Sequence, residues 1–303
     1  MTAALHTTGL GKRYGAHWAL RDCSLELPVG RVVALVGPNG AGKTTLLQLA
    51  VGLTTPSAGS VAVFGLAPSA QPRQVLPRVG FVAQEQPLYR RFSVADMLTL
   101  GRKLNPRWDD ALARTRLARL GLPLDRQVGR LSGGQRSQVA LVMALAKRPD
   151  LLLLDEPVAS LDPLARREFL TVLMEAAADD GLTVLLSSHI IADLERVCDH
   201  LVILSAARVQ LSGDIEEIVA THKLLVGPRR DPASIAHVHH VIQATHTARQ
   251  TTLLVRANGH VWDPSWDVHD LSLEDIVLAY LSQPAAERPA LLARGGEGEE
   301  VPA

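Results

Sequence analysis

The sequence predicts an α/β fold with a mainly parallel sheet. Three short apolar runs, at 32–36, 151–154 and 183–186, have the length and composition of buried strands. A helical segment follows the first run, and residues 163–178, between the other two, carry apolar side chains at helical spacing. Strands that alternate with helices in this way form units in which helices cover a parallel sheet.

The first of these units contains a glycine-rich turn. Gly37-Pro-Asn-Gly-Ala-Gly-Lys-Thr44 fits G-x-x-x-x-G-K-[ST] and stands between a strand and a segment, 43–51, with a helical pattern. Glycines let the backbone wrap a phosphate, and the start of a helix supplies amide donors. Lys43 is expected to reach the terminal phosphates of a nucleotide, and the hydroxyl of Thr44 to hold Mg²⁺. The residues expected to contact the nucleotide are Gly37, Asn39, Gly40, Gly42, Lys43, Thr44 and Thr45.

Two carboxylates, Asp155 and Glu156, follow the second predicted strand. At the carboxyl edge of a parallel sheet, the first can bind Mg²⁺ and the second can orient and deprotonate an attacking water. An acidic pair in this place is often only the start of a helix, but a phosphate-binding loop upstream favours the catalytic role. His189 ends the third strand at the same sheet edge, so it is a candidate for this site as well as for a core histidine.

Residues 93–147 differ from the strand and helix units around them. Ser93 and Asp96 have the spacing of a capping box, residues 109–120 are amphipathic, and residues 135–147 are strongly helical. This pattern predicts a helical insertion between two strands of the sheet.

The composition changes again beyond about residue 221. Histidines become frequent, residues 251–255 have the pattern of a strand, and Ser272 with Asp275 caps a final helix that ends near residue 282. Three histidines, at 237, 239 and 240, suggest a metal site, but no cysteine or acidic partner lies nearby at ligand spacing. A solvated surface is the favoured interpretation of this region, with sensitivity near pH 6.5 as the alternative.

A further motif goes beyond a general nucleotide-binding fold. Leu131-Ser-Gly-Gly-Gln135 stands about twenty residues before the carboxylate pair. With it, the chain resembles the ATPase subunits of ABC transporters, for which LSGGQ is the signature. The resemblance covers residues 5 to about 220, roughly three quarters of the chain. The other family motifs are carried by Tyr14, the phosphate loop, Gln84, Asp155 with Glu156, Ser160-Leu-Asp162 and His189.

The resemblance implies a P-loop NTPase core with an N-terminal antiparallel β portion, a helical insertion and a small C-terminal α+β extension. Together with the composition, it divides the chain into an ATP-binding domain at 1–220, an accessory region at 221–283 and a tail at 284–303. The helical subdomain of the ATP-binding domain is expected at about 93–147. The tail is rich in Pro, Gly, Ala and Glu, which predicts disorder.

The signature motif also has a physical meaning of its own. A serine and two glycines at the start of a helix form an anion-binding nest, although a structural glycine turn is the alternative. The resemblance implies that two copies of this chain, or this chain and a similar partner, pack head to tail, so that the signature of one closes over the ATP of the other. The residues implied at that second phosphate site are Ser132, Gly133, Gly134, Gln135 and Asp162.

The resemblance assigns roles at the edge of the site and names ATP and Mg²⁺ as cofactors. His189 would contact the γ-phosphate and hold the attacking water beside Glu156. Gln84 would bind Mg²⁺ and sense a membrane subunit, and Tyr14 would stack on adenine. The alternatives are an ordinary surface glutamine at 84 and ordinary aromatic packing at 14. The implied ligands of Mg²⁺ are Thr44, Gln84 and Asp155.

Composition and apolar patterning constrain the partners. The 31 basic and 31 acidic side chains give a formal charge of zero, which argues against a nucleic-acid partner. The longest apolar run, about eight residues at 139–146, is far shorter than the roughly 18 to 20 of a spanning helix. We therefore expect the pore to come from a separate multi-span permease, and this chain to lie in the cytoplasm, peripheral on the inner face of the cell membrane. Leu88, Tyr89 and Phe92 lie where the family docks a short helix of that partner, with packing under the helical insertion as the alternative.

The direction of transport rests on weaker cues. The final helix after Ser272, Arg136 after the signature, and Trp108-Asp109 resemble the bacterial branch that exports drugs, antibiotics or lipids, and an importer is the alternative. A soluble ABC-type ATPase that acts on ribosomes or DNA is a rival from another class. Only about 90 residues separate Lys43 from Ser132, without the long coiled coil of the DNA-acting members, and the chain has one cassette rather than two.

Overall fold

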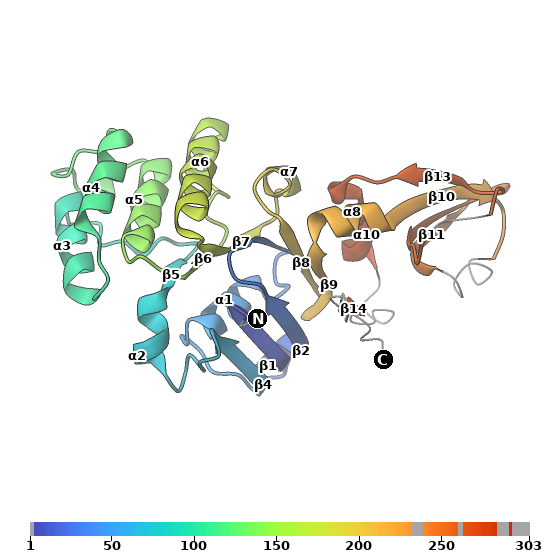
Figure 1. The fold of residues 1–303 in the computed structure, drawn as a ribbon, viewed down its shortest axis with the longest axis horizontal. Coiled ribbons are helices and arrows are strands. Elements are labelled where there is room, and N and C mark those ends of the chain that lie inside the picture. The colour runs from blue at the N-terminus through green and yellow to red at the C-terminus, as the bar shows by residue number, and fades with distance from the viewer. Residues whose placement is uncertain (1–2, 232–238, 260–262, 284–290, 293–303) are drawn as a thin grey trace, which may run out of the picture.

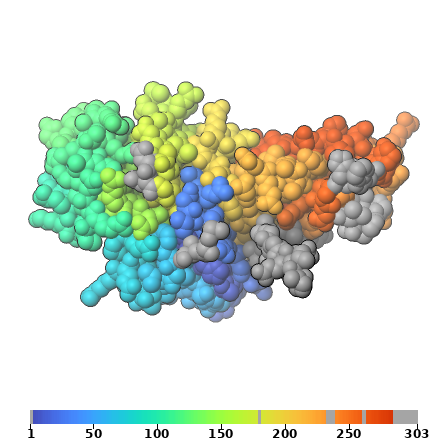
Figure 2. Space-filling model, in the orientation of Figure 1, coloured from blue at the N-terminus to red at the C-terminus, as the bar shows by residue number. Residues whose placement is uncertain are grey.

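The computed structural model describes residues 3–231, 239–259, 263–283 and 291–292. The molecule is elongated, with a helical region at one end, two sheets in the middle and a third sheet with its helices at the other end (Figure 1). The helical and C-terminal regions lie at opposite ends of the face shown in Figure 2. Among the described residues, no helix has both the length and the apolar character needed to cross a bilayer.

The central sheet has seven strands in the order β14-β9-β8-β3-β7-β6-β5. Its middle strands β8, β3, β7, β6 and β5 run parallel, and β9 is antiparallel to β8. The α/β fold class is confirmed, and the three predicted apolar runs are the central strands β3, β6 and β7. The bounds are β3 Val32–Val36, β5 Val79–Val82, β6 Leu151–Leu154, β7 Thr183–Ser188, β8 His200–Ser205, β9 Arg208–Asp214 and β14 Leu291–Leu292.

The predicted antiparallel N-terminal part is a three-stranded sheet in the order β2-β1-β4. Helix α1 packs between this sheet and the central one, because Leu46, Leu47 and Leu49 are buried in a core cluster with residues of both. The start of α1 is therefore held between two sheets. The bounds are β1 Leu5–Tyr14, β2 His17–Leu27, α1 Lys43–Ala50 and β4 Ala58–Val63, with α2 Pro72–Val75 and the 3-10 turn η1 Leu76–Arg78 leading to β5.

The helical region carries three helices, α3 Val94–Leu104, α4 Asp110–Arg119 and α5 Gly133–Leu145, with the 3-10 turn η2 Val128–Arg130 before the last. Ser93 forms the expected capping box with Asp96. Helix α5 begins two residues before the predicted start at Gln135, because Ser132 is its N-cap and forms a second capping box with Gln135. The three helices share a core of their own.

Ion pairs join the helical region to the amino end of the central sheet. The Arg78 guanidinium, just before β5, and that of Arg107, after α3, both bind the carboxylate of Asp150, just before β6, at 2.5 and 3.1 Å. Arg148 binds Asp109 at 2.8 Å. These groups lie at the opposite end of the strands from Asp155. Helices α6 Pro163–Asp180 and α7 Ile191–Leu194 pack against the central sheet on the side of α5.

The C-terminal region is an antiparallel sheet in the order β11-β12-β10-β13 with helices α8 and α10 against it (Figure 1). The predicted strand lies within β12, and Ser272 forms the predicted cap of α10 with Asp275. Helix α10 shares the large core cluster with α7 and β8, so this region packs directly on the central sheet. The bounds are α8 Ile215–Thr221, β10 His222–Pro228, β11 His240–His246, β12 Gln250–Arg256, β13 Asp267–Asp270 and α10 Leu273–Ser282.

His222 lies in the joint between α8, β10 and α10. Its side chain is fully buried; Nδ1 donates to the Ile218 carbonyl oxygen at 2.6 Å, and Nε2 accepts from the Tyr280 hydroxyl at 3.0 Å. Burial lowers the pKa of His222 to about 4 and raises the pKa of Tyr280 to about 12. At least this histidine is therefore a buried core residue rather than part of a solvated surface that titrates near pH 6.5.

The other predictions for the C-terminal region have separate outcomes. Among the described residues there is no group of three or more His, Cys, Asp or Glu that could hold a metal, and His237 lies outside them. His239 is buried, and its Nδ1 accepts from the amide of Asn258. Most of the tail lies outside the described residues, but β14 within it pairs parallel to β9. Outside the C-terminal region, the two cysteines, Cys23 and Cys198, are free and buried.

Candidate nucleotide-binding and hydrolysis site

The glycine-rich loop connects β3 to α1 at the carboxyl edge of the central sheet. A Cβ at Gly37 would lie 2.1 Å from the carbonyl oxygen of Leu204 on β8, and a Cβ at Gly42 would lie 2.3 Å from that of Ala19. Gly42 also has a φ of 107°, which residues with side chains rarely adopt. Glycine at these two positions therefore allows the loop to lie against the neighbouring strands and to direct the first amides of α1 into one place.

A cavity of about 530 Å³ opens at this loop. It gathers side chains from β1, the loop, the segment after β5, and the ends of β6 and β7. Of the predicted site residues, it is lined by Tyr14, Asn39, Gly40, Gly42, Lys43, Thr44, Thr45, Gln84, Glu156 and His189. Five further lining residues were not predicted from the sequence: His17, Ala19, Pro38, Ala41 and Ala159. Pro38 and Ala41 lie within the glycine-rich motif and Ala159 is next to Ser160, whereas His17 and Ala19 lie on β2.

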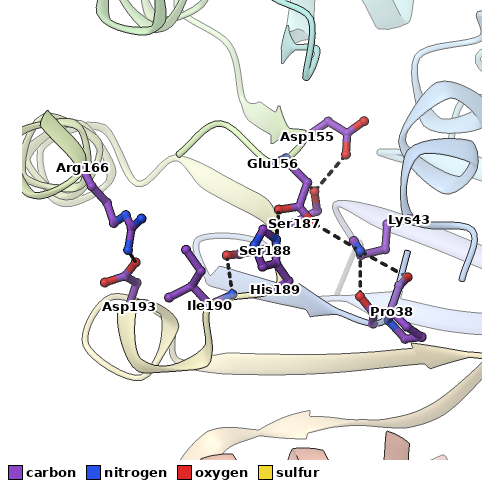
Figure 3. A network of polar contacts seen from close by, with 11 residues as sticks. Pro38, Lys43, Asp155, Glu156, Arg166, Ser187, Ser188, His189, Ile190 and Asp193 are labelled. Carbon is purple, nitrogen blue, oxygen red and sulfur yellow. Dashed lines mark hydrogen bonds and ion pairs between the residues drawn. The ribbon is translucent and has the colours of Figure 1, made fainter. Parts of the chain in front are cut away.

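Lys43 folds back into the loop that precedes it. Its side chain is only 6% exposed, and Nζ donates to the carbonyl oxygens of Gly37 at 2.7 Å and Pro38 at 3.4 Å. The same ammonium lies 3.2 Å from Oε1 of Glu156 (Figure 3). The cation and the carboxylate are thus paired in a place that is nearly closed to solvent.

The second oxygen of Glu156 is also engaged. Nδ1 of His189 donates to Oε2 at 2.8 Å, and the imidazole itself is 55% exposed toward the cavity opening. Glu156 therefore stands between Lys43 on one side and His189 on the other (Figure 3). A carboxylate held in this way can accept a proton from a water molecule in the cavity once one of its two partners moves away.

Asp155 is not among the residues that line the cavity. It is buried, and among the described residues its Oδ1 accepts a hydrogen bond from the hydroxyl of Ser187 at 2.9 Å. The same hydroxyl oxygen accepts from the backbone amide of Glu156 at 2.8 Å. Ser187 was recognised from the sequence only as a residue that follows an apolar strand. Its position at the end of β7, two residues before His189, is the signal that could have found it.

The predicted magnesium ligands provide oxygen atoms only. Thr44 at the start of α1 and Gln84 line the cavity, whereas Asp155 precedes Glu156 in the chain and is not among the lining residues. A hydroxyl, an amide oxygen and a carboxylate are the hard donors that Mg²⁺ prefers, and Mg²⁺ usually takes only one or two carboxylates along with phosphate oxygens. The residues present therefore fit this ion.

Tyr14 ends β1 at the rim of the cavity. The residue is 50% exposed, and the Lys12 ammonium lies 5.2 Å from the ring centroid. A half-exposed ring at a cavity rim differs from the core packing that was the alternative for this residue. The nearby Trp18 is more buried and has the Arg13 guanidinium over its ring.

The signature residues lie elsewhere on the molecule. Ser132 caps α5 with an exposed side chain, and Asp162 caps α6, where its Oδ1 accepts from the amides of Leu164 and Ala165 at 3.0 Å. Among the described residues that line the cavity, none is Ser132, Gly133, Gly134, Gln135 or Asp162. One chain therefore brings together the phosphate loop, Gln84, Glu156 and His189, but leaves its own signature apart from them.

Comparison with known proteins identifies the family. Residues 20–159 match the family described as ABC transporter. The Nod factor export ATP-binding protein I of Cupriavidus metallidurans is 38% identical over 227 residues, which cover 72% of this chain and 74% of that protein. The nickel import ATP-binding protein NikO of Rhodobacter capsulatus is 38% identical over 242 residues, which cover 74% and 94%. This chain belongs to the ATP-binding subunits of ABC transporters.

A solved structure supports the same assignment for this ABC subunit. A chain described as the ATP binding subunit of an ABC transporter is 30% identical, covers 72% of this chain and 92% of its own, and superposes with a TM-score of 0.64. The members of this family are ATPases coupled to transport, as the resemblance implied. The relatives are named for export as well as import, so the direction of transport differs among proteins that are equally similar to this ABC ATPase.

Proposed function

We propose that this ABC ATPase binds ATP with Mg²⁺ in the cavity at the phosphate loop and hydrolyses it with Glu156 as the general base. Lys43 and the first amides of α1 bind the phosphates, and Tyr14 stacks on the adenine. Thr44, Gln84 and Asp155 hold Mg²⁺, which supplies charge neutralisation at the phosphate oxygens when it is bound.

The pairing of Lys43 with Glu156 supports a defined order of events. When the phosphates enter, the ammonium exchanges its contacts with Gly37 and Glu156 for phosphate oxygens, because those carry more negative charge. Oε1 of Glu156 is then free to accept the proton of the attacking water. His189 stays on Oε2 and fixes the orientation of the carboxylate.

The single observation that carries the proposed cycle is that the signature of the chain lies outside its own nucleotide cavity. Ser132 lies at the exposed start of a helix, which is an arrangement that can bind an anion. The phosphates of the ATP in the same chain would not reach it. A head-to-tail pair, with a second copy or a similar ATPase, supplies that anion, since the ATP of each chain then meets the signature of the other. ATP binding closes this pair and hydrolysis reopens it.

The cycle powers a separate permease that spans the membrane and holds this ABC ATPase on its inner face. The support is an exposed aromatic pair beside Gln84: Tyr89 is 59% exposed, Phe92 is 39% exposed, and their ring centroids lie 5.1 Å apart. Leu88, in contrast, packs partly into the helical region. The two rings can receive a short helix, while Leu88 transmits its position to the core.

We further propose that the transport is export of a drug, antibiotic or lipid-like substrate. The support is the short C-terminal region closed by helix α10, together with Trp108 and Arg136, which resemble that branch. The relatives of this chain also include a protein named for the opposite direction, the nickel importer. Uptake or release of substrate by vesicles that contain the subunit with its permease distinguishes the two.

The experiment that tests the cycle uses Glu156→Gln as a background that retains ATP without hydrolysis. We expect this variant to form a dimer with ATP in sedimentation velocity, and Ser132→Arg in the same background to bind ATP as a monomer, because the long cation blocks the second phosphate site. Wild-type turnover in Glu156→Gln would remove Glu156 from the base role. An undiminished dimer with Ser132→Arg would contradict the head-to-tail pair.

A further inference from the structure

Ser187 joins the two carboxylates of the site through one hydroxyl group. It is fully buried near the end of β7, where the register pairs Leu154 with Leu186 and so places Ser187 level with Asp155 on the adjacent strand β6. Its single O–H proton goes to Asp155 Oδ1, at 2.9 Å, and its oxygen accepts the Glu156 amide, at 2.8 Å (Figure 3). Both bonding roles of the hydroxyl are thus used without conflict.

The backbone of Glu156 needs such a contact. Its φ is 47°, in the left-handed region that residues with a side chain seldom occupy unless the surroundings hold them there. The bond from its amide to Ser187 supplies part of that support. Without the left-handed turn, two successive residues at a strand end would direct their side chains to opposite faces, and the turn is what brings the carboxylate of Glu156 to Lys43 and His189.

Asp155 is held from both neighbouring strands. Its amide donates to the carbonyl oxygen of Val82 on β5 at 2.9 Å, and its carboxylate receives the hydroxyl of Ser187 on β7. A hydrogen bond from a neighbouring group fixes the orientation of a carboxylate that binds a metal ion. Ser187 therefore sets which oxygen of Asp155 remains available to a metal ion.

We propose that Ser187 is a positioning residue, which orients the metal-binding carboxylate of Asp155 and fixes the backbone of the base Glu156 at the same time. The inference rests on the proposed function, because it assumes the roles of those two carboxylates. Ser187 is not among the residues that line the cavity, and its hydroxyl contacts Asp155 and Glu156, so it acts through those two residues. His189, which directly follows β7, contacts the carboxylate of Glu156, so the end of this strand holds both the backbone and the side chain of the base.

The test compares Ser187→Ala with Ser188→Ala as the matched control. Ser188 is equally buried and adjacent, but its hydroxyl accepts from the amide of Ile190 rather than contacting a carboxylate. We expect Ser187→Ala to lower kcat and to raise the Mg²⁺ concentration at half-maximal hydrolysis about 10- to 100-fold, as is typical for partners of metal ligands, while Ser188→Ala leaves both near the wild-type values. Ser187→Thr, which keeps the hydroxyl, should restore most of the loss.

Two further measurements do not depend on turnover. Mn²⁺ affinity, measured by electron paramagnetic resonance with a non-hydrolysable ATP analogue, should fall in Ser187→Ala by the same order. Hydrogen exchange of the peptide that contains the Glu156 amide should become faster in the absence of nucleotide. Thermal unfolding of each variant shows that it is folded.

The outcomes separate this inference from the proposed function. If Ser187→Ala keeps the wild-type Mn²⁺ affinity and Glu156 exchange, or if Ser188→Ala changes them equally, the positioning role of Ser187 is wrong. If the wild-type protein has no Mg²⁺-dependent hydrolysis, the proposed function fails, whereas the exchange measurement still decides whether Ser187 holds the Glu156 backbone.

Discussion

Two buried polar clusters in this molecule are built in opposite ways. In the nucleotide cavity, Lys43 and Glu156 bury opposite charges, and Oε1 of Glu156 makes no hydrogen bond although the ammonium lies 3.2 Å away. In the joint at the start of the C-terminal sheet, His222 is buried without charge, and both of its ring nitrogens have partners, the Ile218 carbonyl and the Tyr280 hydroxyl.

The difference shows how to distinguish a working site from a structural one. In the cavity, the ammonium of Lys43 and the carboxylate of Glu156 are paired with each other, and both can exchange this contact for one with a ligand. In the joint, both ring nitrogens of His222 already have partners, and these two contacts connect α8, β10 and α10. Changes in the cavity should therefore act on ATP, and changes in the joint on folding.

The largest expected effect is on ATP affinity. Lys43→Met removes the ammonium and keeps much of the apolar stem, so ATP should bind on the order of 100-fold more weakly, the cost of losing hydrogen bonds from a charged group. Isothermal titration calorimetry with ATP measures this loss. The hydrogen bonds of His222 in the joint should be unaffected, because Lys43 makes no contact there. An unchanged ATP affinity would contradict the role of Lys43.

An effect of comparable size is expected from acid on the joint, here on the free energy of unfolding. An exposed histidine has a pKa of about 6.5, whereas burial lowers that of His222 to about 4, so the unfolded chain binds the extra proton first. The free energy of unfolding should then fall as the pH decreases from about 6.5 to about 4, by up to about 3 kcal/mol from this residue. Urea unfolding at a series of pH values, followed by circular dichroism, measures the slope.

The control for this pH effect is His222→Gln, which retains an amide donor and an amide acceptor but does not titrate. Its free energy of unfolding should depend less on pH in the same window. Equal slopes for the variant and the wild type would show that other groups cause the acid sensitivity.

The smallest effect is expected from one hydroxyl in the joint. Tyr280→Phe keeps the ring and removes the hydroxyl that donates to Nε2 of His222, at a cost of about 1 kcal/mol in the free energy of unfolding. Urea unfolding at neutral pH measures it, and kcat for ATP should remain that of the wild type. A variant that unfolds like the wild type but hydrolyses ATP more slowly would reverse the assignment of the two clusters.

The sequence was sufficient for the parts of the fold that repeat a local pattern. The apolar runs predicted strands β3, β6 and β7, and residue spacing predicted the capping boxes at Ser93 and Ser272. The cavity gathered Lys43, Glu156 and His189 as expected, because parallel strands end at one edge of the sheet. These predictions needed no knowledge of distant contacts.

The missing parts depend on contacts between distant segments. The bonds of Ser187 arise from the register of β6 and β7, in which Leu154 lies opposite Leu186, and a single strand does not encode that pairing. His222 was expected among solvated histidines, but α10, whose Tyr280 is 58 residues further along the chain, covers it. Histidine suits either environment, so composition did not distinguish them.

Variants of Gly37 would affect the packing of the central sheet as well as the phosphate loop. Because a Cβ there would collide with the backbone of Leu204, only glycine allows the phosphate loop to pack directly against β8. Strand β8 continues through β9 and α8 into the C-terminal sheet. A side chain at position 37 would displace two strands before it contacted any phosphate. Loss of activity in such a variant would thus report poor assembly of the sheet, and would appear as low yield or aggregation rather than as a folded protein with weak affinity for ATP.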